Sequence, residues 1–180
     1  ETAALAVQAA LTGHLVFSTI HTNSATGAIP RLVDMGIDPF LIAPTLLAVI
    51  GQRLVRQLCE GGGKPFPVDE SLKMLLNQQF ADLPEQYRKV LPPFTTFYHT
   101  TPTPECSTGT HGRIGVFEIL KMTKTLENVL LTHPTEEAIY EEARKEGLLT
   151  MREDAIVKGL AGVIPFEEIN TLGGELFPEV

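Results

Sequence analysis

Two histidines flank a short apolar segment near the start of the sequence. His14 precedes the run Leu15–Ile20 (LVFSTI), and His21 follows it, directly before Thr22 and Asn23. Imidazole, hydroxyl and amide groups all form hydrogen bonds that can hold a polar or charged ligand. Open α/β sheets bind their ligands at the carboxyl ends of the strands. The order of residues therefore predicts a ligand site at the end of a buried strand.

Each of these polar residues also has a structural interpretation. The two histidines are seven positions apart, so a regular strand would direct their side chains from opposite faces, and we expect no shared metal ion. His21 can take part in the site, or it can cap the next helix or bond a loop carbonyl. Spacing alone favours a structural role for His14. Thr22 and Asn23 fit a helix cap at least as well as a phosphate contact.

The hydrophobic pattern predicts an α/β fold around this site. The Ala-rich helix at 1–11 should end at Gly13, and the apolar run after it should form a strand covered on both faces. Asp38-Pro39 predicts the start of a helix towards residue 50, which Pro44 should bend or split. Further helices are expected at 25–33, 69–80, 126–131 and 136–145, after the capping box Thr150-x-x-Glu153, and from Pro165. A second strand is expected at 114–120, a strand or helical turn at 52–58, a loop at 59–67 and irregular chain at 84–104.

Composition excludes several classes of protein. The 180 residues are 43% hydrophobic with a formal charge of −8, which is typical of a globular protein and argues against direct binding to nucleic acid. No apolar run is long enough to form a transmembrane segment. Two cysteines without a secretory signal indicate a reducing compartment. Because the sequence begins at Glu1 inside a predicted helix, we expect it to be part of a longer protein.

Several segments, in the right order, resemble the secretion ATPases, the superfamily that powers type II secretion, type IV pilus assembly and competence. Residues 1–16 and 18–25 are similar to the histidine-box region of that family. The long insertion after Cys59 is typical of the assembly-type subgroup. The other matching segments are 31–36 (RLVDMG), 52–59 (QRLVRQLC), 108–109 (TG), 112–118 (GRIGVFE), 144–148 (RKEGL) and 152–155 (REDA).

The resemblance implies the C-terminal portion of a RecA-like (P-loop NTPase) core, active as a homo-hexamer that hydrolyses ATP. It implies Mg²⁺ as well, with nucleotide and metal bound mainly by motifs that precede Glu1 in the family. The partner would be an inner-membrane platform protein, and the location cytoplasmic and peripheral to that membrane. The expected segments are the second half of the core (1–58), an inserted module (59–112), a returning core strand (113–122), a helical C-terminal subdomain (123–171) and a loose tail (172–180).

The resemblance also assigns roles to the site residues. It implies a catalytic role for His21, which can sense the terminal phosphate or hydrogen-bond the acidic residue that orients water, and it adds His14 to the catalytic residues. It places the nucleotide near Thr22 and Asn23, and near Gln52 and Arg53. The expected function is therefore that of an ATPase fragment, inactive by itself. The alternative is a non-catalytic ring subunit or adaptor of the same machinery.

Two features of the predicted insertion depart from binding motifs. Gly61-Gly62-Gly63-Lys64 lacks the first glycine and the hydroxyl residue of a phosphate-binding loop, so we expect a flexible loop there. Many assembly-type relatives hold zinc with two Cys-x-x-Cys pairs, of which only Cys59 and Cys106 remain. Because structural zinc takes four ligands, no bound metal is expected. Apolar packing should replace it, among Phe66, Phe80, Tyr87, Phe94, Phe97 and Tyr98.

Overall fold

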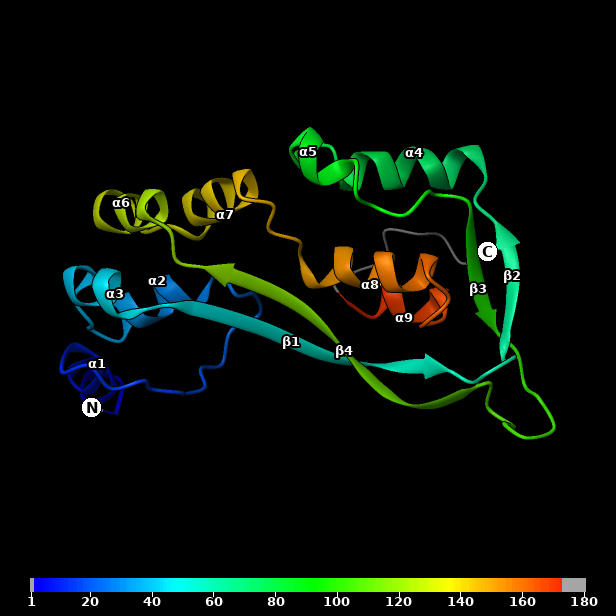
Figure 1. The fold of residues 1–180 in the computed structure, drawn as a ribbon, viewed down its shortest axis with the longest axis horizontal. Coiled ribbons are helices and arrows are strands. Elements are labelled where there is room, and N and C mark those ends of the chain that lie inside the picture. Colours follow the sequence, from blue (N-terminus) through cyan, green and yellow to red (C-terminus); the bar gives the residue numbers. More distant parts are fainter. Residues whose placement is uncertain (1, 173–180) are drawn as a thin grey trace. The chain divides into compact units, whose positions relative to one another are not determined.

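The computed structural model describes residues 2–172 (Figure 1). Its mixture of helices and strands confirms the predicted α/β class. No helix in this range is both long and apolar enough to cross a membrane. The predicted tail lies outside the described residues from residue 173 onward. The helices are α1 (Thr2–Leu11), α2 (Ala28–Asp34), α3 (Pro39–Thr45), α4 (Glu70–Gln79), α5 (Glu85–Arg88), α6 (Lys124–Thr132), α7 (Glu136–Lys145), α8 (Met151–Leu160) and α9 (Phe166–Asn170); the strands are β1 (Ala48–Leu58), β2 (Gly63–Pro67), β3 (Thr96–Thr100) and β4 (Thr110–Lys121).

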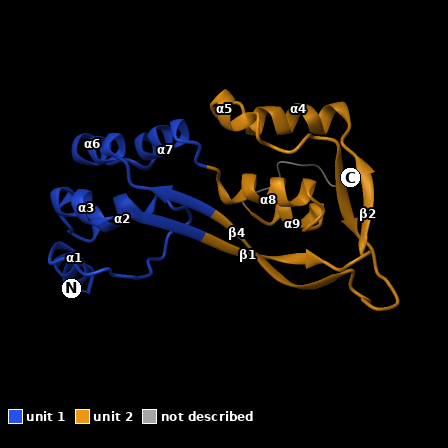
Figure 2. Cartoon of the chain, viewed as in Figure 1, with its two compact units in different colours: residues 1–51, 118–148 blue, residues 52–117, 149–180 orange. Residues whose placement is uncertain are grey.

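The chain forms two compact units (Figure 2). Unit 1 comprises residues 1–51 and 118–148, and unit 2 comprises residues 52–117 and 149–180. Strands β1 and β4 pair with each other, and their arrows run in opposite directions (Figure 1). The boundaries between the two units fall within β1 and β4. The boundaries predicted for the inserted module differ from these, since they follow residues 58 and 112. The predicted inserted module stays a proposal.

Unit 1 packs its helices around one apolar core. Helices α1 and α6 both contact α3, and α7 contacts α6. Leucine, isoleucine and alanine side chains fill the space, as expected for helices with one apolar face. The buried members of this core are Ala25, Ile29, Ile37, Ile42, Ala43, Leu120, Leu126, Leu130, Ile139, Ala143 and Leu148.

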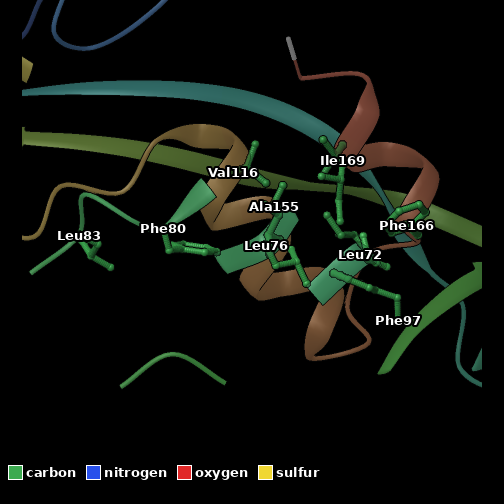
Figure 3. Packing of buried hydrophobic residues seen from close by; sticks show 12 residues of the cluster. Leu72, Leu76, Phe80, Leu83, Phe97, Val116, Ala155, Phe166 and Ile169 are labelled. Atoms are coloured by element: carbon green, nitrogen blue, oxygen red, sulfur yellow. The ribbon is translucent and has the colours of Figure 1, made fainter. Parts of the chain in front are cut away.

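Unit 2 has its own core, in which aromatic side chains take a large share (Figure 3). Strands β2 and β3 pair in antiparallel register, with Phe66 opposite Phe97, and helices α8 and α9 contact β3. The ring of Phe166 lies 5.0 Å from that of Phe97 and 5.4 Å from that of Phe66. The buried members of this core are Val55, Leu72, Leu76, Phe80, Leu83, Phe97, Val116, Ala155, Ile156, Ile164, Phe166 and Ile169.

Most predicted helix ends are confirmed. Helix α1 ends before Gly13, whose φ of 92° is in the left-handed region that favours glycine. Asp38 caps α3 by accepting the N–H of Phe40, and Asp69 caps α4 by accepting that of Leu72. Thr150 opens α8 with the predicted capping box. These ends are determined by residues only a few positions apart, which the sequence displays directly.

The strand predictions are partly wrong. Residues 14–20 form no strand, since no neighbouring chain in the described range supplies a hydrogen-bonded ladder for them. In contrast, the glycine- and proline-rich segment predicted as loop contains β2, and the segment predicted as irregular contains α5 and β3. The open choice at 52–58 is resolved as strand, within β1. Helix α3 ends at Thr45, directly after Pro44 and earlier than predicted.

Candidate functional site

Four of the six predicted site residues lie on the chain between α1 and α2: His14, His21, Thr22 and Asn23. His21 and Asn23 are exposed, and Thr22 is half-buried. The apolar side chains before them are exposed too, with 70% of Leu15 and 89% of Phe17 accessible. The prediction of a covered strand is therefore wrong for this chain. His21 nevertheless presents its imidazole at the surface rather than in the apolar core.

A compact turn follows the exposed residues. The hydroxyl of Thr22 donates to the carbonyl of Ser24 at 2.8 Å, and the hydroxyl of Ser24 accepts the N–H of Gly27 at 3.0 Å. Helix α2 begins only at Ala28, with Gly27 as its N-cap and no side-chain cap. Thr22 and Asn23 therefore do not cap this helix, and the structural interpretation of these two residues as a helix cap is wrong.

Two glutamates that are distant in sequence bind this turn. Glu118, on β4, accepts the N–H of Ala25 at 2.7 Å. Glu136, at the start of α7, accepts the hydroxyl of Ser24 at 2.5 Å. Neither residue is among the predicted site residues, although Glu118 ends the matching segment 112–118. The signal for Glu118 was a single charged residue within the apolar run 115–120 (GVFEIL), where burial of a charge requires polar partners.

His14 lies at the end of α1. Its Nδ1 is 3.0 Å from the hydroxyl of Thr12 and 3.2 Å from the carbonyl of Ala9. These contacts are local, and they resemble those of a residue that completes a helix end. They agree with the structural role that spacing alone favours for His14, while its catalytic role stays a prediction.

Gln52 and Arg53 belong to unit 2 and lie on β1. Both side chains are exposed. The side-chain nitrogen of Gln52 lies next to Gly115 on β4, at 3.1 Å from the position that a Cβ would occupy there. The other four predicted site residues belong to unit 1. The two groups of predicted site residues therefore lie in different units. Nucleotide binding by Gln52 and Arg53 stays a prediction.

The remaining candidates for ligand binding are used for structure. Cys59 and Cys106 form a disulfide with a Cα–Cα distance of 6.6 Å, which leaves neither sulfur as a metal-binding thiolate. The disulfide disagrees with the interpretation of these two cysteines as a sign of a reducing compartment. Within residues 2–172, no group of three or more His, Cys, Asp or Glu side chains is placed to hold a metal ion. Gly63 and Lys64 pair with Thr100 and His99 in the β2–β3 ladder. The loop prediction is therefore wrong for Gly63 and Lys64, whereas Gly61 and Gly62 lie in the connection between β1 and β2. The segment does not lead from a strand into a helix as a phosphate-binding loop does.

Comparison with known proteins identifies the family. A family model described as "Type II/IV secretion system protein" matches residues 1–171. The chain is 41% identical to the type II secretion system protein E of Pectobacterium carotovorum, 39% to the type II secretion system ATPase E of Vibrio cholerae, and 36% to the type IV pilus assembly ATPase PilB of Pseudomonas aeruginosa. Each match covers 94% of this chain and 31%, 31% and 28% of the relative, respectively. The chain thus spans about a third of the length of these relatives, and it belongs to the family of type II/IV secretion system proteins.

Proposed function

We propose that this chain is the C-terminal part of a hexameric, RecA-like ATPase that powers type IV pilus assembly or type II protein secretion. Relatives that bear the name ATPase match 94% of the chain, and this is the observation that carries the proposal. The complete ring would act on an inner-membrane platform protein, on the cytoplasmic side and peripheral to that membrane. Residues 59–112 would form the inserted module, and residues 123–171 the helical C-terminal subdomain.

In this proposal, ATP with Mg²⁺ supplies the phosphoryl group, and the chain contributes one edge of the site. The residues present fit only such an edge, because the described range offers an exposed imidazole and a hydroxyl but no phosphate-binding loop. His21 would donate a hydrogen bond to the terminal phosphate or to the acidic residue that orients water. Thr22 and Asn23 would contact phosphate oxygens beside it. His14 would be the second catalytic residue, and Gln52 and Arg53 would bind another part of the nucleotide.

The experiment that tests the proposal measures ATP turnover by the complete gene product. Replacement of a hydrogen-bond donor aimed at developing charge lowers kcat by about 100-fold or more. We therefore expect a loss of this size for His21→Ala. His133→Ala is the matched control, because His133 is also an exposed histidine of unit 1 but lies at the end of α6, outside the candidate site. Its turnover should equal that of the wild type.

Three outcomes would contradict the proposal. Wild-type turnover by the His21→Ala variant would remove His21 from the reaction. Absence of turnover in the complete wild-type protein would favour the alternative, a non-catalytic ring subunit or adaptor. The isolated 180-residue chain is expected to show no turnover, so robust hydrolysis by this chain alone would contradict the assignment of the phosphate cradle to other parts of the protein.

A further inference from the structure

A carboxylate on β4 binds the backbone directly after the candidate site. Glu118 Oε1 accepts the N–H of Ala25 at 2.7 Å and that of Thr26 at 3.4 Å. All three residues are buried, with 4% of Glu118 exposed. A carboxylate is costly to bury unless hydrogen bonds compensate for its lost hydration. The two amides supply that compensation, and they lie four and five positions after His21.

The backbone of β1 at Gly51 lies close to both Ala25 and Glu118. A Cβ placed at Gly51 would lie 3.4 Å from the nitrogen of Ala25 and 3.5 Å from Cβ of Glu118. The turn after the site therefore approaches both paired strands closely at this point. Because each strand is held by its partner, Glu118 connects the turn to an ordered part of unit 1.

A second carboxylate holds the turn from another side. Glu136 accepts the hydroxyl of Ser24 at 2.5 Å and is 3.4 Å from the hydroxyl of Thr26. This contact is made by side chains, whereas Glu118 binds the backbone itself. Backbone contacts determine the path of the chain. Glu118 therefore controls the position of the residues that lead up to Ala25 more directly than Glu136 does.

We infer that Glu118 is a positioning residue for the nucleotide site: its carboxylate fixes the backbone at Ala25 and Thr26 and thereby places His21, Thr22 and Asn23. The inference rests on the proposed function. The segment before the site is exposed and has no regular structure, so it offers little to hold these side chains from its amino end. Their position must then depend on the anchor that follows them. Glu118 acts through the loop and makes no contact with phosphate.

The test compares Glu118→Ala with Glu118→Gln in the complete gene product. The first measurement is hydrogen–deuterium exchange of the Ala25 and Thr26 amides, resolved to single residues. Glu118→Ala removes the acceptor, so exchange at both amides should accelerate at least tenfold. Glu118→Gln keeps an oxygen acceptor of the same reach, so exchange should stay within about threefold of the wild type.

The second measurement is steady-state ATP hydrolysis. Misplacement of a reacting group by about 1 Å can lower turnover 100-fold, so kcat of Glu118→Ala should fall 10- to 100-fold. KM for ATP should stay within about twofold, because the nucleotide is proposed to be bound mainly by other parts of the protein. Glu118→Gln should restore most of the turnover.

Asp154→Ala is the control for a purely structural effect. Asp154 Oδ2 accepts the N–H of Phe117 at 2.8 Å, which is the same type of bond, made to the neighbouring residue of β4, and it also binds the ammonium of Lys158. Asp154 lies on α8 in unit 2 and makes none of the hydrogen bonds described for the turn. This variant should lose a similar amount of thermal stability and keep wild-type kcat at temperatures well below Tm.

Each outcome decides one part of the inference. Unchanged exchange at Ala25 and Thr26 in Glu118→Ala overturns the anchor. Faster exchange with unchanged kcat overturns the positioning role, as does an equal loss of kcat in Asp154→Ala. Absence of turnover in the wild type overturns the proposed function and with it the role in turnover, while the exchange data still decide whether Glu118 anchors the turn. Should Glu118→Ala fail to fold, Glu118→Asp, whose carboxylate is one carbon shorter, replaces it with the same expectations.

Discussion

The two units hold their connecting segments by different means. In unit 2, β2 and β3 pack aromatic side chains into the core beside α8 and α9, and the Cys59–Cys106 disulfide adds a covalent link. In unit 1, segment 14–20 leaves Leu15, Val16 and Phe17 exposed. Most of the large apolar side chains that are exposed in the described part of the chain belong to unit 1, among them Leu5, Phe40 and Ile50. The turn that follows this segment is fixed by hydrogen bonds to two carboxylates.

This difference separates stability from site geometry. A fully buried aromatic side chain contributes several kcal/mol to the free energy of unfolding, whereas one hydrogen bond contributes about 1 kcal/mol. Apolar substitutions in the core of unit 2 should therefore have the largest effects on stability. Polar substitutions at the turn of unit 1 should have small effects on stability and larger effects on the position of the candidate site residues.

The largest expected effect is that of Phe97→Ala in unit 2. Phe97 is 0% exposed, and its ring lies 6.2 Å from that of Phe66 and 5.0 Å from that of Phe166. Removing a buried phenyl ring leaves a cavity and lowers the free energy of unfolding by about 3–5 kcal/mol. Urea denaturation followed by circular dichroism measures the loss. Val90→Ala, at a position of unit 2 that is 80% exposed, should change stability by less than about 0.5 kcal/mol. Equal effects of the two substitutions would show that the aromatic cluster does not hold unit 2 together.

Reduction of the disulfide should have the next largest effect. The bond joins cysteines 47 positions apart, and a cross-link that closes a loop of this length stabilises a protein by about 2–4 kcal/mol through its effect on the unfolded chain. Dithiothreitol should therefore lower Tm of the wild type and release two thiols. The double variant Cys59→Ala/Cys106→Ala should melt at the lower temperature with or without reductant. A wild-type Tm that does not respond to reduction would show that apolar packing alone closes this part of unit 2.

Local features were predictable from the sequence, and distant pairings were not. The caps of α3 and α8 follow from residues a few positions apart, so Asp38 and Thr150 identify them directly. Strand β2 contains Gly63, Pro65 and Pro67, which indicate a loop when read alone. It is a strand because β3, far along the chain, supplies its hydrogen-bonded partner. Strand formation depends more on such partners than on local preference.

The candidate site shows the same limit. The polar residues His21, Thr22 and Asn23 follow an apolar run, and this local order drew attention to them. Their anchors on β4 and α7 come from segments about 90 and 110 positions later in the sequence, and no spacing rule connects them. The disulfide was not predicted for a related reason. Two single cysteines in the sequence resemble a zinc motif that has lost ligands, and only the fold shows that the two residues are neighbours.

The third substitution, Ser24→Ala, should have a smaller effect on stability than the two changes in unit 2. It compares the two carboxylates that bind the turn of unit 1. Ser24→Ala removes the hydroxyl that donates to Glu136 and accepts the N–H of Gly27. Because Ser24 is only partly buried, water can replace these partners, and the free energy of unfolding should fall by about 1 kcal/mol. The Ala25 and Thr26 amides should stay protected, since Glu118 still binds them, and kcat of the complete protein should fall less than in Glu118→Ala. Urea denaturation and hydrogen–deuterium exchange measure the two effects separately. A loss of amide protection as large as that in Glu118→Ala would mean that the two carboxylates hold the turn as one cooperative unit, and that the side-chain contact matters as much as the backbone contact.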